Sequence, residues 1–247
     1  MRSRASSCVI LLMVLLASLA ATALAQTPAG LLAHWKMDEV ADGKVADVTG
    51  KGHDAVLGPE GAKLAVVDSP CGKGLRFDGQ EQAAYLQIEN WQDLNSLEQL
   101  TVMAWIKPAE RSVSCEILCG KGDKSGDPPW PGWRLRYGWA MLIFEYGDAA
   151  GEHVRLTSPA FSVPVGFFSH VAATCDGKTV RLYVNCVQVA EAEAIGPVAP
   201  GKRPYIIGNY VGRKDAYAMS GVLDEIKVFD RALTEEELFA QASADMP

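Results

Sequence analysis

The stretch Val171-Ala172-Ala173-Thr174-Cys175-Asp176-Gly177-Lys178-Thr179-Val180-Arg181-Leu182-Tyr183-Val184 decides the fold class. In its second half, Val180, Leu182 and Val184 alternate with other residues, so one face of a strand would meet a core. Asp176-Gly177 lies between the halves, and both residues tolerate the positive φ that a two-residue turn requires. The stretch therefore predicts an antiparallel hairpin with Asp176-Gly177 at its centre.

Similar strand patterns occur along the rest of the chain, with turn sequences such as Asp78-Gly79, Tyr137-Gly138 and Gly196-Pro197 between them. Many short strands with a turn between each indicate a β-sandwich or barrel. The predicted strands cover residues 31–37, 85–88, 101–107, 115–119, 133–137, 140–146, 153–156, 169–174, 179–184, 187–192, 203–207 and 221–229.

One helix is expected, near the C-terminus. Thr234 and Glu237 have the spacing of a capping box, and Leu238 begins an apolar face, so the pattern predicts a helix over residues 235–242. The sequence has no internal repeat, low-complexity linker or second-domain signal. We therefore predict one domain over residues 26–247, since a sandwich commonly forms a single unit of about 200–250 residues.

The N-terminus has the pattern of a secretory signal peptide. Arg2 and Arg4 precede an apolar run over residues 9–19, and Ala23-Leu24-Ala25 is a small-x-small cleavage sequence. The apolar run is shorter than the roughly 18 residues that a membrane span needs. We therefore expect residues 1–25 to be removed, the protein to be secreted to an extracellular or periplasmic location, and no membrane association to remain after cleavage.

Charge narrows the choice of partners. The formal net charge is −7, and Lys and Arg form no cluster along the sequence. Nucleic acids and anionic membranes attract positive charge, so neither is an expected partner. The acidic residues leave carboxylates available for a hard cation such as calcium.

Five cysteines remain after the predicted cleavage, so at least one is expected to lack a disulfide partner within the chain. Cys115 and Cys119 fall in one predicted strand, about 13 Å apart at the rise of an extended chain. That separation exceeds the roughly 7 Å limit for a disulfide. We interpret the cysteines mostly as small core residues; one bridge remains open, without assignable partners. They are Cys71, Cys115, Cys119, Cys175 and Cys186.

Several segments together resemble the laminin-G-like domains of the concanavalin-A-like jelly-roll family. They occur in the family's order over nearly the whole chain after residue 31 and include AHWKMDE at 33–39, DVTGKGHDA at 47–55, GLRFDG at 74–79, TVMAWIKP at 101–108, the hairpin at 170–184, and the closing segment at 221–237. The resemblance implies an all-β fold, a two-sheet antiparallel jelly-roll sandwich with one short C-terminal helix.

Three features depart from the family pattern, and one of them, Thr49 in place of the common serine, should matter little. Phe168 replaces a usual tryptophan, and Asn185-Cys186 replaces Asp-Gly in a hairpin turn. Because cysteine is strained at positive φ, we expect this second turn to be longer than two residues.

The resemblance also implies a structural calcium site at the edge of the sandwich. The matching residues are Asp47, the carbonyls near Gly50 and Gly52, and Asp224. Calcium prefers several oxygen ligands, and glycine allows backbone carbonyls to turn inward. The alternative is that Asp47 and Asp224 cap turns by accepting backbone amides.

A proline-rich loop, Asp127-Pro128-Pro129-Trp130-Pro131-Gly132-Trp133, is the predicted ligand-binding element. Prolines stiffen it, and binding residues often lie on loops of a rigid scaffold. We expect Trp130 to be the main contact and Tyr137 the second, with Trp133 also a candidate. The alternative for Trp133 is a core position at the start of a strand, and Trp130 could instead pack on its own loop.

No catalytic pattern is recognisable. Glycosidases of this fold carry two acids on one strand face, and the E-x-D-x-x-E spacing is missing; Glu145 is the one acid of its predicted strand. We therefore predict a non-catalytic extracellular module that binds a carbohydrate or a protein ligand. Two alternatives stay open: a polysaccharide hydrolase or lyase on the same scaffold, and a structural surface protein without a small ligand.

Overall fold

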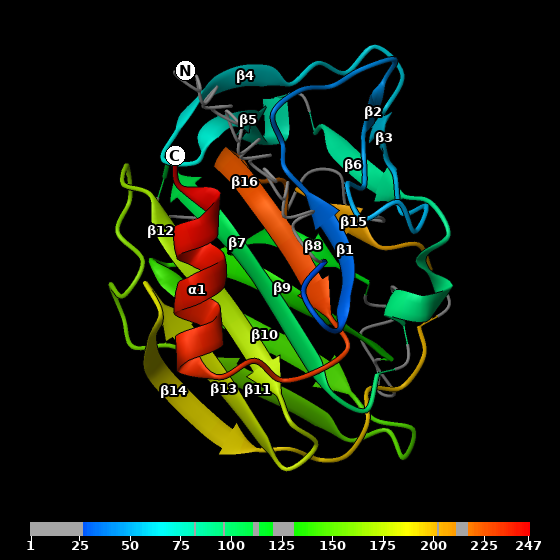
Figure 1. The fold of residues 1–247 in the computed structure, drawn as a ribbon, viewed down its shortest axis with the longest axis vertical. Coiled ribbons are helices and arrows are strands. Elements are labelled where there is room, and N and C mark those ends of the chain that lie inside the picture. The colour runs from blue at the N-terminus through cyan, green and yellow to red at the C-terminus, as the bar shows by residue number, and fades with distance from the viewer. Residues whose placement is uncertain are drawn as a thin grey trace, which may run out of the picture.

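The chain forms a sandwich of two antiparallel sheets with one helix on the outside (Figure 1). The computed structural model describes residues 27–81, 83–95, 97–110, 114–120, 131–201, 203–210 and 217–247. The predicted signal peptide, residues 1–25, lies outside the described residues. The predicted jelly-roll architecture is confirmed.

Sheet A has the strand order β14-β13-β12-β7-β16-β5-β4, and β1 pairs with β16 outside this path. Its strands are β1 (Leu31–Trp35), β4 (Ala65–Ser69), β5 (Gly72–Asp78), β7 (Leu100–Pro108), β12 (Ser169–Cys175), β13 (Thr179–Val184), β14 (Val187–Glu193) and β16 (Ser220–Phe229). Strands from the beginning, middle and end of the chain therefore lie side by side in this sheet.

Sheet B has the order β11-β10-β9-β8-β15-β6-β3-β2. Its strands are β2 (Lys44–Val45), β3 (Ala55–Gly58), β6 (Tyr85–Ile88), β8 (Cys115–Cys119), β9 (Gly132–Gly138), β10 (Met141–Gly147), β11 (His153–Thr157) and β15 (Ile206–Ile207). Two short 3-10 helices, η1 (Gly79–Glu81) and η2 (Trp91–Leu94), connect strands.

The main core lies between the two sheets and follows the alternation of the strands. In β9, for example, Trp133, Leu135 and Tyr137 belong to the core, whereas Arg134 and Arg136 alternate with them and point to the outer face of sheet B. This pattern puts aromatic rings inside and leaves charged side chains on the outside of the same strand.

Helix α1 (Glu235–Asp245) covers the outer face of sheet A (Figure 1). Its Leu238 is buried in a second apolar cluster with sheet residues such as Met103, Tyr183 and Phe229. The capping box is confirmed, because Thr234 accepts the amide of Glu237 while the Glu237 carboxylate accepts the amide of Thr234.

The deciding hairpin forms between β12 and β13, but its loop differs from the predicted turn. Asp176 and Thr179 close the loop, since the Asp176 amide donates to the Thr179 carbonyl at 3.1 Å. The two central residues are Gly177, at φ 86°, and Lys178. The Asp176 carboxylate accepts the amides of Lys178 and Thr179 at 2.9 and 2.7 Å. The predicted centre was therefore wrong by one residue, because Asp176 caps the loop.

The turn between β13 and β14 also differs from expectation. Val184 pairs with Val187, so Asn185 and Cys186 form a two-residue turn, at φ 51° and 63°. The expected longer turn is wrong. The Asn185 carboxamide accepts the amide of His170 at 3.0 Å, a bond that holds this strained turn against β12.

The cysteines behave as predicted from spacing. Cys115, Cys119 and Cys175 are buried, and all five described cysteines are free thiols. Among the described residues, no helix is long and apolar enough to cross a membrane.

Candidate functional site

The β9–β10 hairpin presents a tryptophan to solvent. Gly138 pairs with Met141, so the two turn residues are Trp139 and Ala140, at φ 52° and 60°. This left-handed backbone costs an L-residue about 1–2 kcal/mol. The Trp139 side chain is nevertheless 49% exposed, so the core does not demand a large ring in this turn.

A second exposed ring comes from the segment between β11 and β12, residues 158–168. Phe161 is 62% exposed and also has a positive φ, 66°. The segment is anchored on the same hairpin, because the Val163 amide donates to the Ala140 carbonyl at 3.1 Å. This hydrogen bond joins the turn of Trp139 to the bend of Phe161, because Ala140 directly follows Trp139 and Val163 lies two positions after Phe161.

A third exposed ring, Phe167, belongs to the same segment. The preceding residue, Gly166, donates its amide to the Pro108 carbonyl at the end of β7, at 2.8 Å. We call Trp139, Phe161 and Phe167 the aromatic rim. All three lie in short segments fixed by backbone hydrogen bonds to strands, an arrangement that limits the entropy lost when a ligand binds.

A pocket of about 690 Å³ adjoins the anchored end of this segment, since Gly166 and Pro108 belong to its wall. The rest of the wall comes largely from the ends of β5 and β16. Its side chains mix basic, acidic and apolar groups: Arg76, Lys107, Asp78, Glu81, Phe77 and Val222. The pocket has the volume of a small-ligand site and carries donors and acceptors of both charges.

A charged network lies on the outer face of sheet B, on the strands that carry the β9–β10 turn. Glu145 of β10 contacts three arginines: Arg134, Arg136 at 3.2 Å and Arg155 at 3.5 Å. Arg134 also bonds Glu116 of β8 at 3.0 Å. Glu116, Glu145 and Arg136 are almost fully buried, although outward-facing strand residues are commonly exposed.

The electrostatics of this network distinguish it from a hydrolytic pair. Burial acts to lower the pKa of Arg134, but the charges of Glu116 and Glu145 outweigh it and raise that pKa. Burial lowers the pKa of Arg136. A glycosidase needs one carboxyl group that gives a proton. Here arginines occupy both oxygens of Glu145, an arrangement that indicates a structural ion network.

The predicted ligand residues are not brought together at a surface. Trp133 is fully buried; its indole donates to the Leu94 carbonyl at 2.9 Å, and its ring centroid lies 4.9 Å from that of Tyr205. Tyr137 also faces the core. These placements match the core alternative for Trp133. Trp130 lies outside the described residues, in the segment that leads into β9.

The residues of the expected calcium site carry other bonds. The Asp47 carboxylate accepts the amides of His34 at 3.1 Å and Thr49 at 3.0 Å, together with the Thr49 hydroxyl. The Gly52 carbonyl accepts the side chain of Asn90 at 2.9 Å, and Gly50 adopts φ 73°. This geometry matches the turn-capping alternative for Asp47, so calcium would have to replace these donors.

Asp224 has different partners from Asp47. Its carboxylate accepts the Ser69 hydroxyl and the amide of Glu225, the latter at 2.8 Å. Burial, together with the neighbouring Glu225 charge, raises the pKa of Asp224 to about 7, against the bonds that lower it.

Residues 78–239 match the family described as the concanavalin A-like lectin/glucanases superfamily. The chain belongs to this superfamily. The matched segment includes the β9–β10 hairpin and the aromatic rim. A search of curated proteins finds no match to the chain.

Solved structures similar to this superfamily member include toxin and polysaccharidase domains. The binding domain of Paraclostridial Mosquitocidal Protein 1 has a TM-score of 0.66 and 17% identity, over 85% of this chain and 51% of that one. Domain 4 of AbnA, a GH43 extracellular arabinanase from Geobacillus stearothermophilus in complex with arabinotriose, has a TM-score of 0.64 and 23% identity, over 87% and 98%. These likenesses establish the fold.

A third similar structure is the ligand binding domain of botulinum neurotoxin serotype D in complex with N-acetylneuraminic acid, with a TM-score of 0.62 and 13% identity. The coverage is 87% of this chain and 51% of that one. This superfamily member therefore spans about half the length of each of the two toxin domains, and nearly all of the arabinanase domain.

Sequence reasoning missed the aromatic rim and the charged network. The Tyr137-Gly138 sequence predicts the turn two residues too early; the Gly138–Met141 pairing puts the turn at Trp139-Ala140. Glu145 is isolated within its own strand because its partners lie on β9 and β11. The sequence offers one signal for this site, a strand register that puts Trp139 at the tip of the hairpin. A tryptophan at a hairpin tip has little core to pack against and is therefore a candidate for ligand contact.

Proposed function

We propose that this protein is a non-catalytic glycan-binding module and that the aromatic rim is its contact surface. The observation that carries the proposal is the exposure of Trp139 and Phe161 on backbones held at positive φ. Strained backbone is found preferentially at functional sites. Flat aromatic rings suit the apolar faces of sugars, and the nearby pocket supplies polar groups that would fix a ligand's orientation.

The expected affinity is modest. A stacked aromatic ring contributes about 0.5–1.5 kcal/mol beyond the area it buries. Three rings with several hydrogen bonds would therefore give weak binding to one sugar and tighter binding to a chain or a multivalent surface. The arabinanase domain and the neurotoxin domain are described with arabinotriose and with N-acetylneuraminic acid, which supports a glycan as the ligand class here.

A glycan-array screen of the purified protein tests this proposal. We expect retention on one class of glycan and loss of that retention in Trp139→Ala and Phe161→Ala. The matched control is Phe239→Ala, because Phe239 is similarly exposed, at 63%, but lies on α1 over the other sheet. If all three variants retained the glycan like the wild type, the aromatic rim would not be the contact surface. Release of shortened sugars by catalytic amounts of protein would contradict a purely binding role.

The predicted Trp130 contact belongs to the same proposal. Trp130 lies four positions before Arg134 in the segment leading into β9. We expect Trp130→Ala to weaken glycan retention without lowering the melting temperature. A marked drop in melting temperature would instead indicate that Trp130 packs on the fold.

Calcium binding and secretion complete the proposal. We expect calcium, if it binds through Asp47 and Asp224, to raise the melting temperature relative to chelator, because it would bind the folded form alone. An unchanged melting temperature contradicts the site. We also expect the secreted protein to begin at Gln26, which N-terminal sequencing checks; an intact Met1 contradicts cleavage.

A further inference from the structure

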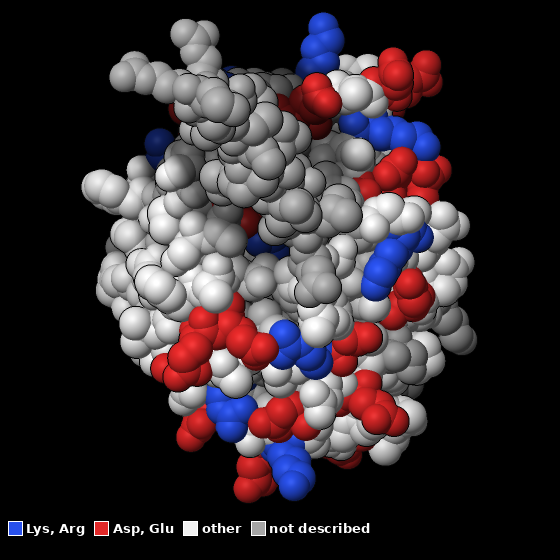
Figure 2. Space-filling view, in the orientation of Figure 1, with Lys and Arg blue, Asp and Glu red and all other residues white. Residues whose placement is uncertain are grey.

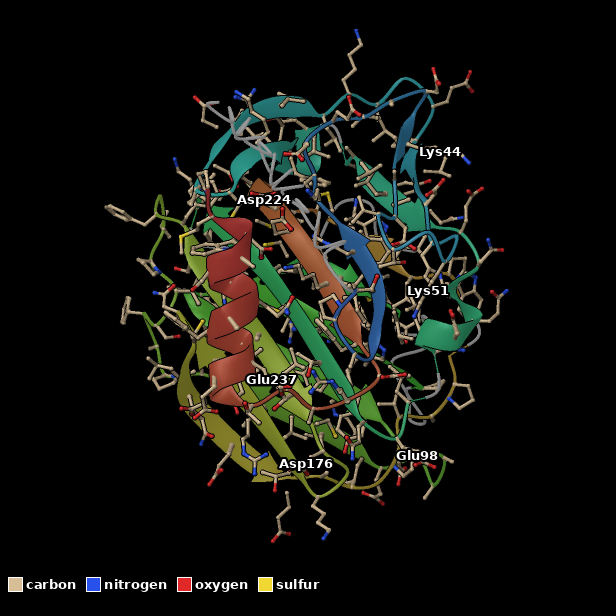
Figure 3. All side chains as sticks on the ribbon, in the orientation of Figure 1. Lys44, Lys51, Glu98, Asp176, Asp224 and Glu237 are labelled. Carbon is tan, nitrogen blue, oxygen red and sulfur yellow. The ribbon has the colours of Figure 1, made fainter. Side chains whose placement is uncertain are left out.

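Three potential metal ligands meet on the outer face of sheet A, far from the aromatic rim. His34 comes from β1, Glu225 from β16, and Asp245 is the last residue of α1. One ligand atom from each lies within 4.8 Å of the other two, and His34 Nε2 contacts Glu225 Oε2 directly. Figure 3 shows Asp224, the neighbour of Glu225 in the sequence, close to the C-terminal end of α1.

Asp245 supplies an independent sign that a ligand is needed. Its side chain is only 7% exposed. Its Oδ1 atom accepts a bond from the Lys227 ammonium, whereas Oδ2 is buried and, among the described residues, has no donor beside it other than the Glu225 carboxyl group, which can donate only when it is protonated. A buried carboxylate oxygen without a donor is unfavourable by about 1–3 kcal/mol or more. A cation at the centre of the three ligands would be the missing partner.

The charge balance points the same way. Asp224, Glu225 and Asp245 offer three buried carboxyl groups, and Lys227 is the buried cation beside them. Two ammonium groups, those of Lys227 and Lys36, act on Glu225, so three ionised carboxylates would still outnumber the cations, and a divalent ion would remove that excess. On the lower part of this face, Figure 2 shows acidic and basic side chains intermixed, so opposite charges lie near one another there.

We propose that His34, Glu225 and Asp245 bind one divalent transition-metal ion, with zinc as the favoured class. An imidazole nitrogen with two carboxylate oxygens suits zinc, whereas calcium and magnesium prefer oxygen ligands throughout. Three protein ligands leave a position for water in a tetrahedral site. Lys227, bonded to the other oxygen of Asp245, orients that ligand from outside the coordination sphere.

The site would act as a latch for the C-terminal helix. Its ligands are distant in sequence, and α1 is also held on sheet A by apolar contacts around Leu238 and by the Lys227–Asp245 ion pair. Because the three ligands meet only in the folded chain, metal binding would stabilise the docked helix and raise the melting temperature.

Equilibrium dialysis and thermal melts with Zn²⁺, Ca²⁺ or no metal test the proposal on the full protein. We expect one zinc per chain, a higher melting temperature with zinc, and an affinity at least about tenfold lower in His34→Gln and in Asp245→Asn. Asp68→Asn, which removes an exposed acid of β4, is the matched control and should bind like the wild type.

Three outcomes would overturn the site: no stoichiometric zinc on the wild type, wild-type affinity in both variants, or stabilisation by calcium alone that His34→Gln retains. If a variant does not fold, the wild type loaded with Co²⁺ provides the second measurement. Visible absorption bands of an ordered, low-symmetry cobalt site support the proposal, and the spectrum of hydrated cobalt contradicts it.

Discussion

Replacing Trp139 by alanine and, separately, by glycine distinguishes two quantities. One is the free-energy cost of the left-handed backbone in the turn, and the other is the contribution of the indole ring to glycan binding. Both substitutions remove the same side chain, so both lose the same packing. The ring is about half buried, which corresponds to about 100 Å² and at most about 2.5 kcal/mol of burial. The two variants differ in the Cβ methyl group, in the freedom of the unfolded backbone, and in how well the new residue tolerates φ 52°.

At an ordinary strand or helix position, glycine is less stable than alanine by about 0.5–1 kcal/mol. At Trp139 the order should reverse, because alanine pays about 1–2 kcal/mol for left-handed backbone and glycine does not. We therefore expect Trp139→Gly to exceed Trp139→Ala by about 1 kcal/mol in the free energy of unfolding, or by about 2–4 °C in melting temperature.

Urea unfolding of the two variants, with the wild type alongside, measures this difference. Glycan retention should fall equally in both, because neither has the ring. An alanine variant as stable as the glycine variant would refute the strained turn. Glycan retention that follows the stability of the variants, and not the presence of the ring, would refute the role of Trp139 in binding.

Three further predictions concern stability. Glu145→Gln should lower the free energy of unfolding by about 3–5 kcal/mol in urea, because it leaves the buried Arg134 and Arg136 without their shared carboxylate; a loss under about 1 kcal/mol would contradict a buried network. Thr234→Ala should cost about 1 kcal/mol through loss of the helix cap, and an unchanged urea midpoint would count against the capping box. Burial lowers the pKa of His170 to about 3, so on acidification the unfolded chain binds the His170 proton at a higher pH than the folded chain does. The free energy of unfolding should therefore fall as the pH is lowered from 6.5 to 3, by up to about 1.4 kcal/mol per pH unit. His170→Gln should lack this slope. The contribution of Asp224, whose raised pKa acts in the opposite sense, is common to both proteins and cancels in their difference. Equal slopes in the two proteins would contradict the assignment to His170.

The fold could be predicted because its determinants are local. The alternation in β7 and β13 and the Thr234 capping box are visible in short windows, and the structure confirms them. The short strands β2 and β3 were missed because two to four residues do not display a period. Strand β4 was missed for another reason: it is an edge strand with partly exposed valines and no continuous buried face.

The candidate site could not be predicted to the same degree, because it depends on register between distant segments. Whether Trp139 sits at the tip of a hairpin depends on the pairing of Gly138 with Met141, and the segment of Phe161 is fixed on this hairpin by bonds such as Val163–Ala140 and Ser158–Leu142. Glu116 and Glu145 are 29 positions apart in the sequence and meet only through Arg134. Local spacing carries no information on such contacts.

The most direct test of the account is a nuclear magnetic resonance titration that follows the indole N–H signals. The sequence contains six tryptophans, and Trp139→Gly identifies the signal of Trp139 by its disappearance. On addition of a glycan retained in the array, we predict that the Trp139 signal shifts with saturation while those of the buried Trp35 and Trp133 stay in place. A titration that saturates binding without moving the Trp139 signal would contradict the proposed binding surface.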